Sequence, residues 1–259
     1  MSPDPADFYD DLAEHYHLIF EDWDRSIERQ AAVLGPLLEK LAARSPLRIL
    51  DCACGIGTQA IGMAQRGHSV VGTDLSRAAV ERATREALQR KLHIQFHVAD
   101  MRDLSALPES DFDAVVVGDN ALPHRLTGED LSRALENIFL RLRPGGGLLA
   151  TMRDYDRLLA TRPTLQGPTF YSAKETRRIV HQVWDWDEDQ YDVHLYLTWR
   201  TPSGWTAKHF ASRYRALTRT ELTSGLKAQG FREIEWLMPE QTKFNQPIVV
   251  ARKSGGVVT

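Results

Sequence analysis

The stretch Arg48-Ile-Leu-Asp-Cys-Ala-Cys-Gly-Ile-Gly-Thr-Gln-Ala60 decides the fold of this chain. It begins as a short apolar run, which is typical of a buried strand, and then passes through Gly55 and Gly57 into a helical pattern. Glycines at such a turn let the backbone approach a ligand closely, and the first turn of a helix leaves backbone N–H groups free. The stretch therefore predicts a strand, a ligand-binding loop and a helix.

Strand-like and helix-like segments alternate on both sides of this stretch. Strands are expected at 47–52, 68–73, 93–98, 112–118 and 147–152, and helices at about 58–66, 77–90 and 129–142. Alternation of this kind predicts an α/β fold, in which parallel strands carry helices on both faces. A helix at 219–229 and two strands at about 231–237 and 247–252 then close the sheet.

Two regions depart from this alternation. Apolar residues recur at helical spacing from Asp7 to about Ala43, where Ser45-Pro46 ends the helix. Between about Tyr155 and Tyr214 the sequence is aromatic and alternates with a period of two, which predicts an antiparallel insertion of about three strands.

We expect a single domain with four parts. These are an N-terminal helical lid at 1–45, a ligand-binding core at 46–153, the antiparallel insertion at 154–216, and a C-terminal helix with closing strands at 217–259.

Composition excludes several classes of protein. The 259 residues are 42% hydrophobic and 26% charged, which fits a globular protein with a sizeable core. No apolar run approaches the ~20 residues that a bilayer requires, and the acidic N-terminus is unlike a signal peptide, so we expect a cytoplasmic protein without a membrane partner. The formal charge of −3 offers no basic surface for nucleic acid.

Metal chemistry is not expected either. Cys52 and Cys54 are the only cysteines, and no His/Cys/Asp cluster has the spacing of metal ligands. The two thiols are interpreted as small buried side chains.

The glycine loop leaves two ligands open. Gly55-Ile-Gly-Thr-Gln-Ala satisfies the loose pattern of dinucleotide sites, and Asp74 stands close to where a ribose-binding acid belongs, so an NAD-dependent oxidoreductase is one candidate. S-adenosylmethionine is the other, because the acid Asp51 at the end of the first strand would repel a pyrophosphate but suits an ammonium group. Asp100, after the third strand, is placed to accept from an adenine amino group.

With the turn Leu142-Arg-Pro-Gly-Gly-Gly147 added, the chain resembles a class I S-adenosylmethionine-dependent methyltransferase over roughly residues 45–153. The resemblance implies a Rossmann-like sheet of seven mainly parallel strands, the last antiparallel. It also implies S-adenosylmethionine as cofactor and S-adenosylhomocysteine as product.

The resemblance implies a set of cofactor-binding residues. Asp74 would bind the ribose hydroxyls, although it alternatively caps the helix that begins near Ser76. The other implied positions are Ala53, Gly55 and Gly57 at the methionine moiety, Asp100 and Met101 at the adenine, Leu75 and Asp119 nearby, the aromatic residues Tyr9, Tyr16 and Trp23, and Arg25 or Arg29 at the cofactor carboxylate.

The acceptor side is similar to the glycine and sarcosine N-methyltransferase branch. The similarity lies in Gly118-Asp-Asn-Ala-Leu-Pro-His124 and Arg153-Asp-Tyr-Asp156. It implies that Asn120 and Arg153 bind an amino acid and that His124 lies close to it. A planar guanidinium matches a carboxylate, but Arg153 alternatively forms an ion pair with a neighbouring aspartate.

The expected function is therefore N-methylation of an amine in a small carboxylate-bearing molecule such as glycine or sarcosine. Methylation of an oxygen or carbon in a specialised metabolite, a nicotinamide-dependent oxidoreductase and a non-catalytic binding module are the alternatives. The partner is a small-molecule methyl acceptor, and homo-oligomers are left open. His124 would act as a base only toward a protonated amine, and Trp184 serves either the core or substrate stacking.

Overall fold

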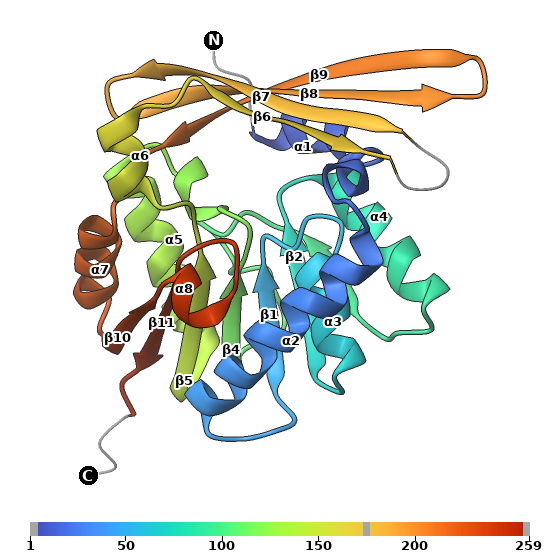
Figure 1. Ribbon diagram of the computed structural model, residues 1–259. Coiled ribbons are helices and arrows are strands. Elements are labelled where there is room, and N and C mark those ends of the chain that lie inside the picture. The colour runs from blue at the N-terminus through green and yellow to red at the C-terminus, as the bar shows by residue number, and fades with distance from the viewer. Residues whose placement is uncertain (1–4, 173–176, 256–259) are drawn as a thin grey trace.

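The computed structural model describes residues 5–172 and 177–255, which fold around a seven-stranded sheet (Figure 1). Its strands are β1 (Arg48–Cys52), β2 (Ser69–Asp74), β3 (Gln95–Val98), β4 (Phe112–Val117), β5 (Leu142–Thr151), β10 (Phe231–Leu237) and β11 (Ile248–Lys253). The order is β10-β11-β5-β4-β1-β2-β3, and β11 alone runs antiparallel to its neighbours β5 and β10. The expected mainly parallel sheet with an antiparallel last strand is confirmed.

Helices cover both faces of this sheet. On one face lie α2 (Trp23–Ala42) and α3 (Thr58–Gln65), where Leu34 and Leu38 pack in the same buried cluster as Ile49. On the other face lie α5 (Gly128–Arg141) and α7 (Arg219–Ala228). Helix α4 (Arg77–Gln89) contacts β2 and β3. Because β1 and β4 are covered on both sides, they read as continuous apolar runs.

The N-terminal region corrects the expectation of one helical stretch from Asp7 to Ala43. The chain forms α1 (Pro5–Leu12), the 3₁₀ helix η1 (Tyr16–Ile19) and then α2. The side chain of Asp22 accepts a hydrogen bond from the backbone N–H of Arg25 at 3.0 Å, and this N-cap starts α2 afresh. Helix α2 ends at Ala42, and its C-cap Ala43 lies two residues before Ser45-Pro46.

The insertion has four strands where about three were expected. Helix α6 (Tyr155–Thr161) leads into β6 (Leu165–Tyr171), β7 (Arg178–Asp187), β8 (Gln190–Thr201) and β9 (Gly204–Arg215), which pair antiparallel in chain order. The additional strand is β6. Its pairing with β7 shifts register between Gln166 and Thr169, where Gly167-Pro168 hides the alternation. Residues 173–176 of the expected insertion lie outside the described residues.

The sheet β6–β9, called the cap sheet below, lies over the carboxyl ends of the central strands, with α1 beneath it (Figure 1). Phe8 and Leu12 of α1 pack against Phe210 and other apolar residues on the inner face of the cap sheet. Arg178 of β7 donates to the backbone carbonyls of Leu18 and Glu21, each at 2.8 Å. The cap sheet is thus fastened to the segment that joins α1 to α2.

One short helix, α8 (Pro239–Thr242), separates β10 from β11. Within residues 5–172 and 177–255, none of the helices combines the length and the apolar character that crossing a membrane demands.

Candidate active site

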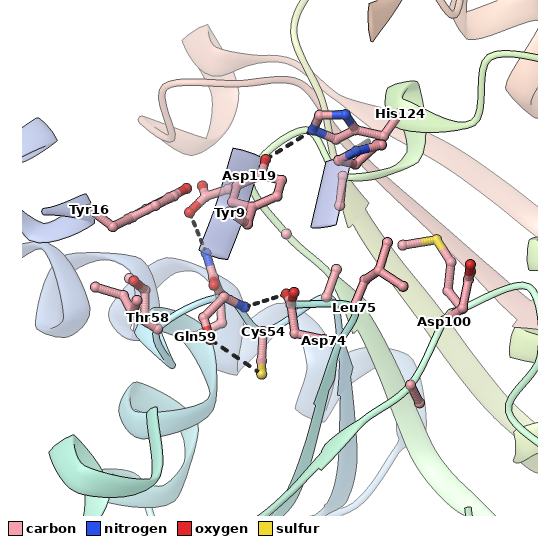
Figure 2. A pocket seen from close by; sticks show the side chains of 18 of the residues that line it. Tyr9, Tyr16, Cys54, Thr58, Gln59, Asp74, Leu75, Asp100, Asp119 and His124 are labelled. Carbon is pink, nitrogen blue, oxygen red and sulfur yellow. Dashed lines mark hydrogen bonds between the residues drawn. The ribbon is translucent and has the colours of Figure 1, made fainter. Parts of the chain in front are cut away.

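A pocket of about 700 Å³ opens where β1, β2 and β4 end at their carboxyl edge (Figure 2). It is called the inner pocket here. Ten of the predicted site residues line it, namely Tyr9, Tyr16, Ala53, Gly55, Asp74, Leu75, Asp100, Met101, Asp119 and His124.

The loop after β1 is held against the end of β2. The backbone N–H groups of Ala53 and Cys54 both donate to the carbonyl of Thr73, at 2.8 and 2.9 Å. Gly55 has a φ of 53°, and Ala53 has a φ of 105°, a region that side-chain-bearing residues rarely adopt. The loop therefore keeps its backbone close to the pocket at a cost in strain.

Asp74 joins this loop to the pocket. Its carboxylate accepts from the N–H of Gly55 at 2.8 Å and from the N–H of Ser76 at 2.9 Å (Figure 2). Ser76 is itself the N-cap of α4, so the capping role considered for Asp74 falls to Ser76. Burial raises the pKa of Asp74 above its ordinary value, against the hydrogen bonds that lower it.

At the end of β3, Asp100 is held by two arginines. Its carboxylate accepts from the guanidinium of Arg102 at 2.9 Å and from that of Arg125 at 3.2 Å. Burial alone raises its pKa, but the hydrogen bonds from Arg102 and the charge of Arg125 lower it, and the net pKa lies below the usual value. The backbone N–H of Met101 has no backbone acceptor among the described residues, so it is open to a ligand nitrogen.

Asp119 and its neighbours form the wall of the pocket after β4. The side-chain amide of Gln59 donates to Asp119 at 3.0 Å and to Gln30 at 2.8 Å. A Cβ at Gly118 would lie 2.9 Å from the Gln59 side chain, so only glycine fits there. Sequence reasoning missed Gln59 and Arg125, because their partners lie 60 and 25 residues away in the sequence.

Trp23 and Gly57 are placed behind the inner pocket and do not line it. The indole of Trp23 donates to the hydroxyl of Thr58 at 2.9 Å and packs with Ile27 and Ile56. Gly57 is the N-cap of α3, with a φ of 95°. Both residues therefore lie on the side of the loop that faces away from the inner pocket.

Asp51 also lies away from the pocket surface. Its side chain is 1% exposed and has no hydrogen-bonded partner among the described residues. Burial, together with the charges of Asp74 and Asp119, raises its pKa to about 8. The suggested contact between Asp51 and an ammonium group stays a prediction.

A second and wider cavity, called the outer cleft here, lies between the start of α2, the core loops and the cap sheet. Tyr9, Tyr16 and Asp119 line both cavities, so the two meet at these three residues. The predicted residues Arg25, Arg29, Asn120 and Arg153 line the outer cleft.

Arg153 is a cation without an acidic partner within the described ranges. It donates to the hydroxyl of Tyr191 at 2.8 Å, and its guanidinium lies 4.6 Å from the ring centre of Trp184. The acids considered as its partners, Asp154 and Asp156, pair with Arg219 at 2.7 and 3.3 Å. The alternative of an ion pair with a neighbouring aspartate is therefore wrong. Trp184 is 2% exposed, and its ring packs against the guanidinium of Arg153.

Asn120 is committed to protein contacts. Its side-chain oxygen accepts from the backbone N–H of Arg153 at 3.0 Å, and its amide donates to the hydroxyl of Tyr155 at 2.9 Å. The side chain thus fixes the chain at Arg153, and direct contact of Asn120 with an acceptor remains a prediction.

His124 lies at the junction of the two cavities. Its Nε2 is 2.9 Å from the hydroxyl of Tyr9, and its ring centre is 4.0 Å from that of Tyr214. Burial lowers its pKa to about 3, and the charges of Arg125 and Arg153 act in the same direction. The imidazole is therefore neutral near pH 7, and a pKa this low makes it a weak general base.

Within residues 5–172 and 177–255 there is no group of three or more His, Cys, Asp and Glu side chains placed to hold a metal ion.

Comparison with known proteins assigns the core. Residues 49–146 match the family model described as a methyltransferase domain. The chain is 31% identical over 153 residues to a glycine/sarcosine N-methyltransferase from Parasynechococcus marenigrum. The aligned region covers 59% of this chain and 53% of that protein. It is 30% identical over 190 residues to the glycine N-methyltransferase of Rattus norvegicus, covering 69% and 64%. These matches span little more than half the length of the curated relatives.

Solved structures extend the likeness to the whole chain. Streptomyces venezuelae DesVI superposes with a TM-score of 0.76 at 19% identity and covers 98% of this chain and 100% of its own. CalS10, an amino pentose methyltransferase from Micromonospora echinaspora solved with S-adenosylmethionine bound, gives 0.72 at 19% identity and covers 88% and 92%.

These matches favour the sulfonium cofactor over the dinucleotide for the loop after β1. Residues 49–146 are thus similar to a methyltransferase domain, and the fold of the chain is like that of solved S-adenosylmethionine-dependent methyltransferases.

Proposed function

We propose that the chain is an S-adenosylmethionine-dependent methyltransferase that binds its cofactor in the inner pocket. The available N–H of Met101 and the ionised Asp100 suit an adenine, and the apolar side chains of Leu75 and Met101 suit its faces. The carboxylate of Asp74 suits ribose hydroxyls. The aromatic rings of Tyr9 and Tyr16 at the junction suit a sulfonium through cation-π contact.

We further propose that the acceptor is an amine in a carboxylate-bearing molecule, of which glycine and sarcosine are the smallest members. The observation that carries this proposal is Arg153. It lines the outer cleft, lacks an acidic partner among the described residues, and has its backbone fixed by Asn120. A cation in such a site is best compensated by an anion that arrives with the substrate.

Catalysis would rest on alignment. When bound, the cofactor would supply a methyl group on a sulfonium sulfur for transfer to a nitrogen that carries a lone pair, with S-adenosylhomocysteine as the leaving group and the proton of the methylated amine released to solvent. Arg153 would hold the acceptor carboxylate, while Tyr9, oriented by His124, and Asp119 would border the path of the amine. The cap sheet and α1 would exclude water from the junction.

A larger amine is the second candidate. The outer cleft is wider than the inner pocket and is lined by more residues than glycine could contact. CalS10, which acts on an amino pentose, also shares this fold across most of both chains. Methylation of an oxygen or carbon remains the alternative in the same class.

The test has two stages. Calorimetric titration with S-adenosylmethionine, S-adenosylhomocysteine and NAD identifies the cofactor, and binding of NAD alone would overturn the proposal. A panel of glycine, sarcosine, methylamine, ethanolamine and amino sugars then identifies the acceptor. We expect the carboxylate-bearing amines to be methylated with the highest kcat/KM.

A pair of variants assigns the carboxylate. Arg153→Gln should raise the KM of glycine by about tenfold or more, since a charge-assisted hydrogen bond contributes ~1.5–3 kcal/mol, while cofactor affinity is unchanged. Arg133→Gln removes the same charge from an exposed position of α5 that lines none of these cavities, and it should leave both constants at their wild-type values. An unchanged KM in Arg153→Gln would exclude the carboxylate contact.

A further inference from the structure

The outer cleft continues beyond Arg153 into a third cavity under the cap sheet. Six residues line both cavities and so mark the passage between them: Ile19, Arg153, Tyr171, Gln182, Asn245 and Gln246. Three of the six carry side-chain amides. The space on the far side of Arg153 is therefore polar, while the junction with the inner pocket is aromatic.

Two of these amides have unused hydrogen-bonding capacity. The side-chain oxygen of Gln246 is buried and has no partner among the described residues. The side-chain oxygen of Gln182 accepts from the indole of Trp184 at 2.8 Å and lies 3.4 Å from the guanidinium of Arg153. This fixes the orientation of the Gln182 amide, and its N–H groups have no acceptor that the described residues supply.

The loop that carries Gln246 is held rigidly beside Arg153. The backbone N–H of Met152 donates to the carbonyl of Pro247 at 3.2 Å, and Phe244 is 5% exposed in the core. A buried carbonyl oxygen without a donor costs ~1–3 kcal/mol, so a ligand donor would relieve that cost. The amide pair thus offers one acceptor and one donor at fixed positions.

We propose that Gln182 and Gln246 form a subsite for a second polar group of the methyl acceptor, one that both donates and accepts hydrogen bonds. A hydroxyl or a carboxamide has this chemistry. The inference rests on the proposed function and narrows its substrate class to amines that carry, besides the group on Arg153, a hydroxyl- or amide-bearing side chain. Glycine is then a minimal acceptor that leaves the subsite unfilled.

The test compares acceptors that differ in one group. Homoserine and norvaline have the same shape, with a hydroxyl in place of a methyl, and glutamine and methionine form a longer pair. Binding of each to the protein saturated with S-adenosylhomocysteine is measured by calorimetry, which needs no turnover. We expect the polar member of at least one pair to bind about tenfold more tightly, the effect of one ~1.4 kcal/mol hydrogen bond.

Gln246→Leu should abolish this preference. Gln89→Leu, on the exposed end of α4, is the matched control and should keep the preference. Equal binding of both members of each pair by the wild-type protein, or a preference that survives in Gln246→Leu, would overturn the subsite.

The same data separate this inference from the proposed function. If carboxylate-free hydroxyl amines bind and lose affinity in Gln246→Leu, the subsite stands and the role of Arg153 fails. If no amine binds the complex with S-adenosylhomocysteine, both fail.

Discussion

The hydroxyl of Tyr9 lies 2.9 Å from Nε2 of His124 and joins α1 to the loop after β4. The imidazole is neutral, and in the tautomer that carries its proton on Nδ1 the Nε2 atom accepts this hydrogen bond. The pair lies at the junction between the inner pocket and the outer cleft. The hydroxyl of Tyr214 in the cap sheet lies 3.5 Å from the hydroxyl of Tyr9, so the cap sheet reaches the same point.

Tyr9→Phe should lower the free energy of unfolding by ~1–3 kcal/mol, because it leaves the buried Nε2 of His124 without a donor. Urea denaturation measures the loss. In a His124→Phe background the same Tyr9 substitution should cost clearly less, and equal costs in both backgrounds would show that the two side chains are not coupled.

His124 should contribute a loss of stability as the pH is lowered from about 6.5, whereas the raised pKa of Asp51, about 8, contributes in the opposite direction over the same range. The pKa of His124 is about 3 in the folded chain, against a value of 6.5 for the unperturbed side chain. Between these values the unfolded chain binds the additional proton, so acid favours unfolding with a slope of up to ~1.4 kcal/mol per pH unit. His124→Gln should flatten the slope measured by urea denaturation at pH 7, 6 and 5. His93→Gln, an exposed position, is the control and should keep it.

Asp74→Ala should weaken S-adenosylmethionine binding by roughly 10- to 100-fold. It removes an anionic acceptor at the pocket and also the anchor of the Gly55 N–H. Asp74→Asn retains one acceptor oxygen, so its affinity should fall between those of the alanine variant and the wild type. Calorimetry compares them with Asp103→Ala, an exposed acid whose loss should have no effect.

Ala53→Gly should raise the free energy of unfolding by about 1 kcal/mol. A φ of 105° costs a side-chain-bearing residue ~1–3 kcal/mol, and the additional entropy of unfolded glycine offsets ~0.5–1 kcal/mol of the relief. Ala64→Gly, inside α3, should instead lower stability by ~1 kcal/mol. A loss of stability in both variants would contradict strain at position 53.

Local sequence pattern was sufficient for most of the central sheet, but β5 begins at Leu142, so the turn expected at Leu142–Gly147 belongs to the strand. The apolar run 48–52 and the glycines that follow depend only on near neighbours, so the strand, loop and helix there were predicted within a residue or two. The same holds for Asp74 and Asp100, which end strands of the parallel core. The acid that ends a parallel strand must lie at the ligand edge of such a sheet.

Longer-range pairings escaped prediction. The division of the N-terminal region depends on the Asp22 cap, and β6 is obscured by Gly167-Pro168. The isolation of Arg153 becomes visible only when Arg219, more than 60 residues away, is seen to hold the neighbouring acids. The periodicity of a sequence does not indicate which cationic side chain pairs with which anionic side chain.

The guanidinium of Arg178 has a mechanical consequence. It donates hydrogen bonds to backbone carbonyls of the segment between α1 and α2. It thereby links this segment to the cap sheet, which lies 160 residues away in the sequence. Helix α1 cannot swing away from the pocket mouth alone without breaking these bonds and the packing of Phe8 on Phe210. A movement of the segment between α1 and α2 is therefore coupled to a movement of the cap sheet.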